Sequence, residues 1–194
     1  MKEPAQQKIV ALDIGGVCVS ILVNNVLRKR TSAVDEKILQ DVFSVEHHLE
    51  CGEVTTSEWA DSLRKYFQID DISRDEALKI FRSVIGTPLS GVCDAVRRAA
   101  ARGYRFIFLS NTSSIHMEEF LSKFELPSLV SGAVFSYAAG SMKPDPGIYE
   151  AFEKQYGKPC LYFDDNRNNI RAAMERGWNA VLFDSFTQLD ELCI

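Results

Sequence analysis

The chain has 194 residues, of which 46% are hydrophobic and 25% are charged, and its formal net charge is −5. These values are ordinary for a globular protein and exclude a disordered chain, a collagen-like repeat and a small disulfide-rich scaffold. The length predicts one domain with a modest insertion. No run of Lys or Arg stands out, which argues against a nucleic-acid partner.

The start of the chain, residues 1–8, is polar and lacks the apolar segment of a signal peptide. No apolar run is long enough to span a bilayer, so we expect a cytoplasmic protein without a membrane partner. The cysteines are odd in number and include no C-x-x-C pair, so neither a disulfide framework nor a zinc site is predicted. Free thiols are the expected state of Cys18, Cys51, Cys93, Cys160 and Cys193.

Short apolar runs bounded by Gly, Asn, Asp or Ser predict five buried strands. They span residues 9–12, 105–109, 133–135, 161–163 and 180–183. Segments with helical periodicity are predicted at residues 92–102, 114–124, 146–156 and 168–176. The alternation of strands and helices predicts the α/β class, with a Rossmann-like parallel sheet covered by helices on both faces.

The stretch 23–85 interrupts this alternation with helical periodicity, many charges and little strand signal. Apolar positions share one helical face at Ile38, Leu39, Val42, Phe43 and Val45, and another at Trp59, Leu63, Tyr66 and Phe67. Helix starts are indicated at residues 55–58 and by a capping-box pattern at residues 73–76. Gly, Pro and Ser predict a loop at residues 86–91. We therefore expect a helical insertion after the first strand.

Polar residues follow four of the predicted strands, and ligands of an open parallel sheet bind beyond the carboxyl ends of its strands. These residues are Asp13 with Gly15 and Gly16, Ser110 with Asn111, Lys143, and Asp164 with Asp165. A carboxylate followed by glycines can attack an electrophilic phosphorus or carbon atom. Further carboxylates would repel it unless a divalent cation lies among them, and Mg²⁺ prefers such oxygen ligands. A lysine with hydroxyl and amide groups would hold the phosphate oxygens.

These segments resemble, in order, the four motifs of the haloacid dehalogenase (HAD) superfamily over residues 9–183. The matching segments are VALDIGGV, IFLSNTSS, GSMKPDPGIYE and LYFDDNRNNI. The resemblance implies a core of residues 1–22 and 86–194 and a helical cap of residues 23–85. More narrowly, HHLECGEVTTSEW, LSNTSSIHMEEF and FDDNRNN resemble the bacterial sugar-phosphatase branch that includes an α-glucose-1-phosphate phosphatase.

The resemblance implies a Mg²⁺-dependent phosphatase of a small phosphorylated metabolite, a sugar phosphate, working as a monomer or homodimer. Asp13 would be the nucleophile that forms an aspartyl-phosphate, and Lys143 would bridge the nucleophile and the phosphate. Ser110 and Asn111 would bind phosphate. The metal would be held by Asp13, the Gly15 carbonyl and Asp164, with Asp165 ligating through water or orienting the site.

One position departs from the pattern of HAD phosphatases. They usually carry a second aspartate two residues after the nucleophile as general acid and base, and here that position is Gly15. A general acid is worth about 10²–10⁴ in rate. Haloacid dehalogenases and the sugar-phosphatase branch share this gap. Three explanations of the missing aspartate are open: another residue supplies the proton, the leaving group needs little protonation, or the protein is catalytically weak. Carbon–halogen hydrolysis and phosphate-ligand binding without turnover therefore stay open as alternatives.

Polar residues of the insertion are candidates for the missing acid, or simply a solvated helix end: His47, His48, Glu50 and Glu53. We expect structural roles for Trp59, His116 and Trp178. Asp145 is expected to cap a helix that begins at Pro146. Asn169 either bonds the acidic loop or continues its helix.

Overall fold

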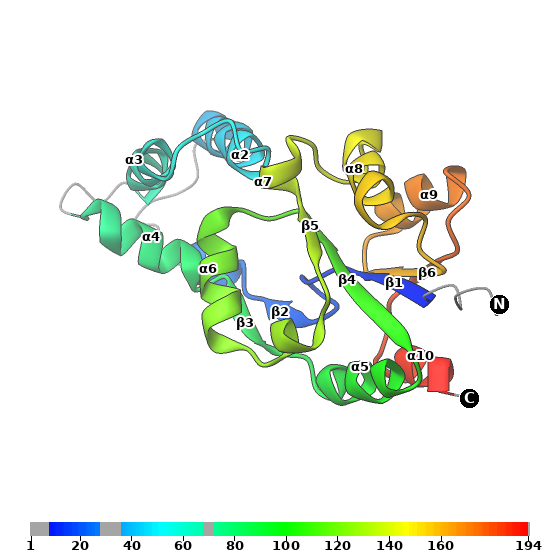
Figure 1. The fold of residues 1–194 in the computed structure, drawn as a ribbon. Coiled ribbons are helices and arrows are strands. Elements are labelled where there is room, and N and C mark those ends of the chain that lie inside the picture. Colours follow the sequence, from blue (N-terminus) through cyan, green and yellow to red (C-terminus); the bar gives the residue numbers. More distant parts are fainter. Residues whose placement is uncertain (1–7, 28–35, 68–71, 194) are drawn as a thin grey trace.

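The computed structural model describes residues 8–27, 36–67 and 72–193 of the protein (Figure 1). At its centre lies a parallel five-stranded sheet with the strand order β5-β4-β1-β6-β7. The strands are β1 (Lys8–Leu12), β4 (Tyr104–Ser110), β5 (Ala133–Phe135), β6 (Leu161–Asp164) and β7 (Ala180–Leu182). The five predicted strands are confirmed to within one residue at each end, because each is a short apolar run that the sheet buries.

Helices cover both faces of the sheet, which confirms the predicted α/β fold. Because side chains alternate along a strand, Val10 and Leu12 pack on one face and Ala11 on the other. The first face is covered by α5 (Val92–Ala101), α6 (Ser114–Lys123) and α10 (Thr187–Asp190). The second face is covered by α8 (Pro146–Tyr156) and α9 (Arg167–Glu175). Short helical turns complete this part: η1 (Leu126–Leu129), α7 (Ser136–Ala139) and η2 (Glu191–Cys193).

A second group of helices lies to one side of the sheet (Figure 1). It comprises α1 (Asn24–Leu27), α2 (Glu36–Glu50), α3 (Thr56–Phe67) and α4 (Arg74–Arg82). These helices share a separate apolar cluster that includes Trp59, Leu63 and Phe81. The capping box at α4 is confirmed, since Ser73 and Glu76 each accept a hydrogen bond from the backbone N–H of the other. The division into core and cap at residues 22/23 and 85/86 stays a prediction.

Two of the apolar positions predicted on α2 pack as expected: Val42 is buried and Val45 is partly buried against the same cluster. The side chains of Ile38, Leu39 and Phe43 lie outside the described part of the structure.

The loop predicted at residues 86–91 is wrong over its first half. The strand β3 (Ile85–Pro88) pairs antiparallel with β2 (Val19–Ile21) in a two-stranded ribbon. A Cβ on Gly86 would lie 2.3 Å from Oγ of Ser20, and that oxygen accepts a 3.0 Å hydrogen bond from the N–H of Thr87. Glycine is needed at position 86 because the two strands approach closely there. A glycine followed closely by a proline is also typical of a turn, which is why the sequence predicted a loop. The ribbon lies where the chain leaves for the helices α1–α4 and where it returns from them.

The cysteine side chains that the structure describes are free thiols, as expected: Cys18 is buried, Cys51 and Cys93 are half-buried and Cys160 is exposed. The side chain of Cys193 lies outside the described part. Over the described ranges, no helix has both the length and the apolar character needed to cross a membrane.

Candidate active site

The carboxyl ends of three adjacent strands bring the predicted site residues together. Asp13 directly follows β1, while Ser110 ends β4 and Asp164 ends β6, and β1 lies between the other two strands. Lys143 precedes α8 and is held against this edge through its backbone. The side-chain amide of Asn111 accepts a 2.7 Å hydrogen bond from the N–H of Lys143 and donates a 2.8 Å bond to its carbonyl oxygen. Asn111 thus positions the lysine.

Lys143 places its ammonium group between two carboxylates. Its Nζ lies 2.9 Å from Oδ1 of Asp13 and 2.7 Å from Oδ2 of Asp164, and it donates a 2.9 Å bond to the carbonyl of Leu109. Burial acts to lower the pKa of Lys143, but the two carboxylates outweigh burial and hold its pKa above the ordinary value. The side chain is therefore a buried, permanently charged cation.

Asp13 offers one free carboxylate oxygen. Its Oδ1 is occupied by Lys143 and by the N–H of Ile14, which donates a 2.7 Å hydrogen bond. No hydrogen bond from the described residues reaches Oδ2. Burial raises the pKa of Asp13 to about 6, and Lys143 opposes that rise. The carboxylate is ionised at neutral pH, with one oxygen held and the other available.

The two aspartates at the end of β6 have different surroundings. Asp164 is fully buried and its Oδ1 accepts hydrogen bonds from the N–H of Asn166 and from Asn169. Its Oδ2 accepts from Lys143, from Asn169 and from the hydroxyl of Tyr162. Both oxygens of Asp164 are therefore engaged by protein donors. This resolves the two options for Asn169, whose amide bonds the acidic loop.

Asp165 is exposed and borders the cavity described below, with its carboxylate against Gly16. A Cβ on Gly16 would lie 2.0 Å from Oδ2 of Asp165, and Gly16 has a φ of +71°. Glycine is thus required there for two reasons. Neither aspartate caps α9, because Asn166 occupies its N-cap and accepts a hydrogen bond from the N–H of Asn168. Oxygens of Asp13, Asp164 and Asp165 lie within 4.8 Å of one another, a group that could hold a metal ion.

A cavity of about 410 Å³ lies between this edge of the sheet and α2. Its volume is within the range of small-molecule sites. The core lines it with Asp13, Gly15, Ser110, Asn111 and Asp165, among others. From α2 it is lined by Glu46 and Glu50. Glu46 was not among the residues predicted from the sequence, although its four-residue spacing from Glu50 is the signal that places both on one helical face.

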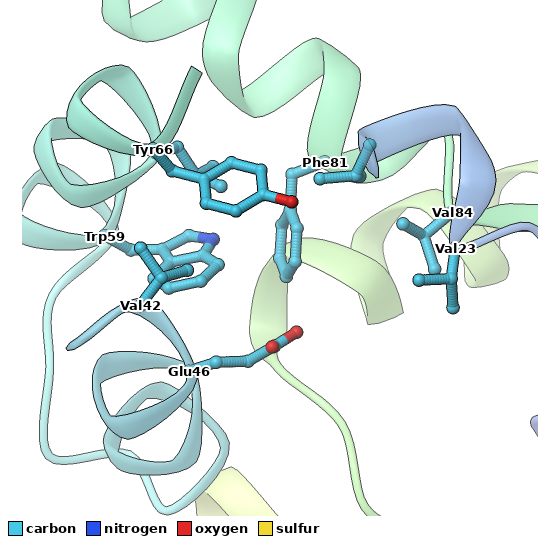
Figure 2. A pocket seen from close by; sticks show the side chains of 9 residues that line it. Val23, Val42, Glu46, Trp59, Tyr66, Phe81 and Val84 are labelled. Carbon is cyan, nitrogen blue, oxygen red and sulfur yellow. The ribbon is translucent and has the colours of Figure 1, made fainter. Parts of the chain in front are cut away.

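A smaller apolar cavity of about 80 Å³ adjoins the first within the helical insertion (Figure 2). Val23, Glu46 and Val84 line both cavities. Figure 2 shows the carboxylate of Glu46 directed into this apolar cavity, towards Phe81 and below Trp59. The two cavities are therefore neighbours that share part of their walls.

The remaining candidates lie away from the large cavity or have structural roles. His48 pairs with Glu53 on the exposed side of α2, and neither lines the cavity, nor does His47. His116 borders the cavity but is buried, and its Nε2 donates a 3.1 Å hydrogen bond to the carbonyl of Phe81. Trp59 and Trp178 are buried packing residues, as expected. Asp145 occupies the N-cap of α8 before Pro146 but makes no capping hydrogen bond through its side chain.

Residues 7–175 match the family of haloacid dehalogenase-like hydrolases. The chain belongs to this family. A relative of this hydrolase, phosphatase MT3486 of Mycobacterium tuberculosis (strain CDC 1551 / Oshkosh), is 28% identical over 132 residues. The match spans 66% of the hydrolase and only 61% of that phosphatase.

Solved structures share the fold of the hydrolase. HAD family enzyme bt-2542 from Bacteroides thetaiotaomicron has a TM-score of 0.81 at 20% identity, with 96% of this chain and 98% of that chain covered. The wild-type form of that enzyme, in complex with magnesium and inorganic phosphate, has a TM-score of 0.78 at 21% identity, covering 95% and 99%. L-2-haloacid dehalogenase from Xanthobacter autotrophicus has a TM-score of 0.64 at 16% identity, covering 90% and 76%. At these identities the likeness concerns the fold alone.

Proposed function

We propose that this hydrolase is a Mg²⁺-dependent phosphatase that removes phosphate from a small phosphorylated metabolite, a sugar phosphate. The observation that carries the proposal is the carboxylate of Asp13, which has one oxygen held by Lys143 and Ile14 and the other unbonded beside the cavity. An ionised carboxylate held in this way is suited to attack a bound electrophile.

The acidic residues fit a magnesium ion by the chemistry of their donors. All the available ligands are oxygens, and three carboxylates outnumber the one ammonium group among them, which calls for a further positive charge. Because Asp13, Gly15 and Asp165 border the cavity whereas Asp164 is fully buried behind it, we assign the metal to Asp13, Asp165 and the carbonyl of Gly15, with Asp164 positioning Lys143. When bound, Mg²⁺ would neutralise charge on the phosphate and orient it.

The reaction follows two steps on Asp13. Its free oxygen forms a bond to phosphorus while the bond from phosphorus to the substrate alcohol breaks, and the alcohol leaves. Water then attacks the aspartyl-phosphate, which releases inorganic phosphate and restores the carboxylate. Lys143 holds Asp13 and offsets negative charge on the phosphoryl group, and Ser110 lies at the same edge to bind phosphate oxygens.

The substrate class is supported by the size and walls of the cavity. A volume of about 410 Å³ suits a small metabolite, and polar side chains line the cavity from both the sheet edge and α2, as a sugar requires. In this proposal the helices α2–α4 act as a cap that shields the site from bulk water. The phosphatase relative, and the fold relative whose structure holds magnesium and inorganic phosphate, support phosphatase chemistry with Mg²⁺.

A phosphate-release screen over phosphorylated metabolites with Mg²⁺ tests the proposal. We expect sugar phosphates to be hydrolysed and chelation to stop the reaction. Halide release from 2-haloacids without metal would instead establish a carbon–halogen hydrolase. Stabilisation by phosphorylated ligands in a thermal-shift assay, with no phosphate release, would establish a binding protein.

A further inference from the structure

Because position 15 is glycine, the segment that follows β1 offers no proton donor to the leaving group of the proposed reaction. The step that expels an alkoxide gains about 10²–10⁴ in rate from such a donor. Gly15 borders the cavity, and a Cβ built on it would lie 3.2 Å from Cδ1 of Ile21. A side chain at this position would crowd Ile21 of β2, and glycine itself carries no proton, so a donor must reach the cavity from elsewhere.

Glu50 lines the cavity from α2, on the side away from the strand ends. It lies in the last turn of α2 and lines the cavity with Asp13. Its carboxyl makes no hydrogen bond or ion pair with the residues that the structure describes. Burial, together with the charges of Glu46 and Asp13, raises its pKa to about 7, while Lys143 opposes the rise. Asp165 borders the same cavity. Glu50 thus carries its proton in a large fraction of molecules near neutral pH.

The end of α2 is held against the core at this point. Gly52, two residues after Glu50, has a φ of +75°, and a Cβ there would lie 2.2 Å from the carbonyl oxygen of Tyr137 in α7. This contact requires glycine and brings the last turn of α2 close to the strand ends. Glu50 is thereby placed by a fixed contact between the two groups of helices.

The other candidate acids are less well placed. His48 is paired with Glu53, and His47 does not line the cavity. Nε2 of His116 is committed to the carbonyl of Phe81. Glu46 lies one turn before Glu50, and its carboxylate is directed into the adjoining apolar cavity (Figure 2).

We propose that Glu50 is the general acid and base of this hydrolase, acting across the cavity in place of the aspartate missing at Gly15. The assignment rests on the proposed phosphatase function. As the phosphorus–oxygen bond to the substrate breaks, its electron pair passes to the leaving oxygen, which takes the proton of Glu50 and departs as a neutral alcohol. The resulting carboxylate then accepts a proton from the water that attacks the aspartyl-phosphate. Phosphate leaves, and both Asp13 and Glu50 return to their starting states.

The test compares Glu50→Gln with the wild type over a series of phosphate esters, from p-nitrophenyl phosphate to glycerol 3-phosphate. The measured quantity is kcat/KM, because it reports phosphoryl transfer to Asp13 without the later hydrolysis step. We expect kcat/KM to fall about 10²–10⁴-fold for the alkyl ester and by less than about tenfold for the nitrophenyl ester, whose leaving group needs no proton. For the alkyl ester, the wild-type rate should decline above a pH of about 7, and the variant should lack this decline.

Two matched variants on the same helix complete the design. His48→Gln, outside the cavity, should leave both esters unaffected, and Glu46→Gln should not change the dependence on the leaving group. The assignment of Glu50 would be overturned if kcat/KM fell equally for both esters in Glu50→Gln, or if it fell selectively for the alkyl ester in Glu46→Gln instead. Either result would leave the proposed phosphatase function standing. If the wild type hydrolyses no ester, the proposed function fails and the assignment fails with it.

Discussion

The imidazole of His116 stacks on the ring of Phe81, with the two ring centroids 4.0 Å apart, and also donates a hydrogen bond to the Phe81 carbonyl. His116 belongs to α6 of the sheet-covering layer, whereas Phe81 belongs to α4 of the helical insertion. The neighbouring Ile115 joins the apolar cluster of the insertion. This contact therefore attaches α4 to the helical layer that covers the sheet, through a buried, neutral side chain.

We predict that protonation of His116 destabilises the fold in mild acid. Burial lowers the pKa of His116 from 6.5 to about 4, so the unfolded chain binds a proton between these values and the folded chain does not. The stabilising contribution is complete above pH 6.5 and is lost as the pH falls towards 4. Between pH 7 and pH 5 the free energy of unfolding should decrease by on the order of 2 kcal/mol more in the wild type than in His116→Gln. Urea unfolding at both pH values measures this, and identical pH dependence would contradict it.

Asp13→Asn should abolish turnover while preserving the fold. An amide cannot form the aspartyl-phosphate, so phosphate release should fall by more than about 10³-fold. The two side chains are nearly equal in shape, and circular dichroism should show unchanged secondary structure. Acid-quenched wild type should gain the mass of a phosphoryl group, and the variant should not. Activity retained in a clean preparation would remove Asp13 from the nucleophilic role.

The two aspartates at the end of β6 should respond differently to substitution. Asp165→Asn should raise the Mg²⁺ concentration needed for half-maximal activity by at least about tenfold, because it removes a ligand. The sequence pattern alone predicts this effect for Asp164, but its buried oxygens already bind Lys143, Tyr162 and Asn169. Asp164→Asn should instead lower the free energy of unfolding by about 3 kcal/mol. Titration with Mg²⁺ after chelation, together with urea unfolding, separates the two effects. Full activity after exhaustive chelation would contradict the metal assignment.

Both substitutions of Lys143 should impair catalysis, and the one that removes the charge should impair it more. Lys143→Ala leaves two buried carboxylates without their shared cation and should lower kcat by about 10²–10³-fold. Lys143→Arg keeps the charge and should lose less, although the planar guanidinium fits poorly where a compact ammonium group is buried. Steady-state kinetics of both variants provide the measurement. An unchanged rate in Lys143→Ala would make Lys143 a loop residue without a catalytic role.

Local sequence pattern was sufficient to predict the five strands of the parallel sheet and the longer helices of this hydrolase. Each of these strands is an apolar run between polar or glycine residues, and α8 begins at Pro146, directly after Asp145, as predicted for a helix that begins with proline. Once the sheet is parallel, its strand ends share one edge. The grouping of Asp13, Ser110 and Asp164 therefore follows from the order of the strands.

Contacts between distant residues were decided only in the folded chain. Ser20 and Thr87 are 67 residues apart, and their pairing turned an expected loop into a strand. The aspartate pair at residues 164 and 165 looks symmetrical in sequence, but packing buries one carboxylate under Lys143 and leaves the other beside the cavity. The choice among the acids of α2 likewise depends on where Gly52 meets Tyr137. Periodicity and turn residues report on neighbours a few positions apart, whereas burial and charge pairing depend on which elements meet when the whole chain packs.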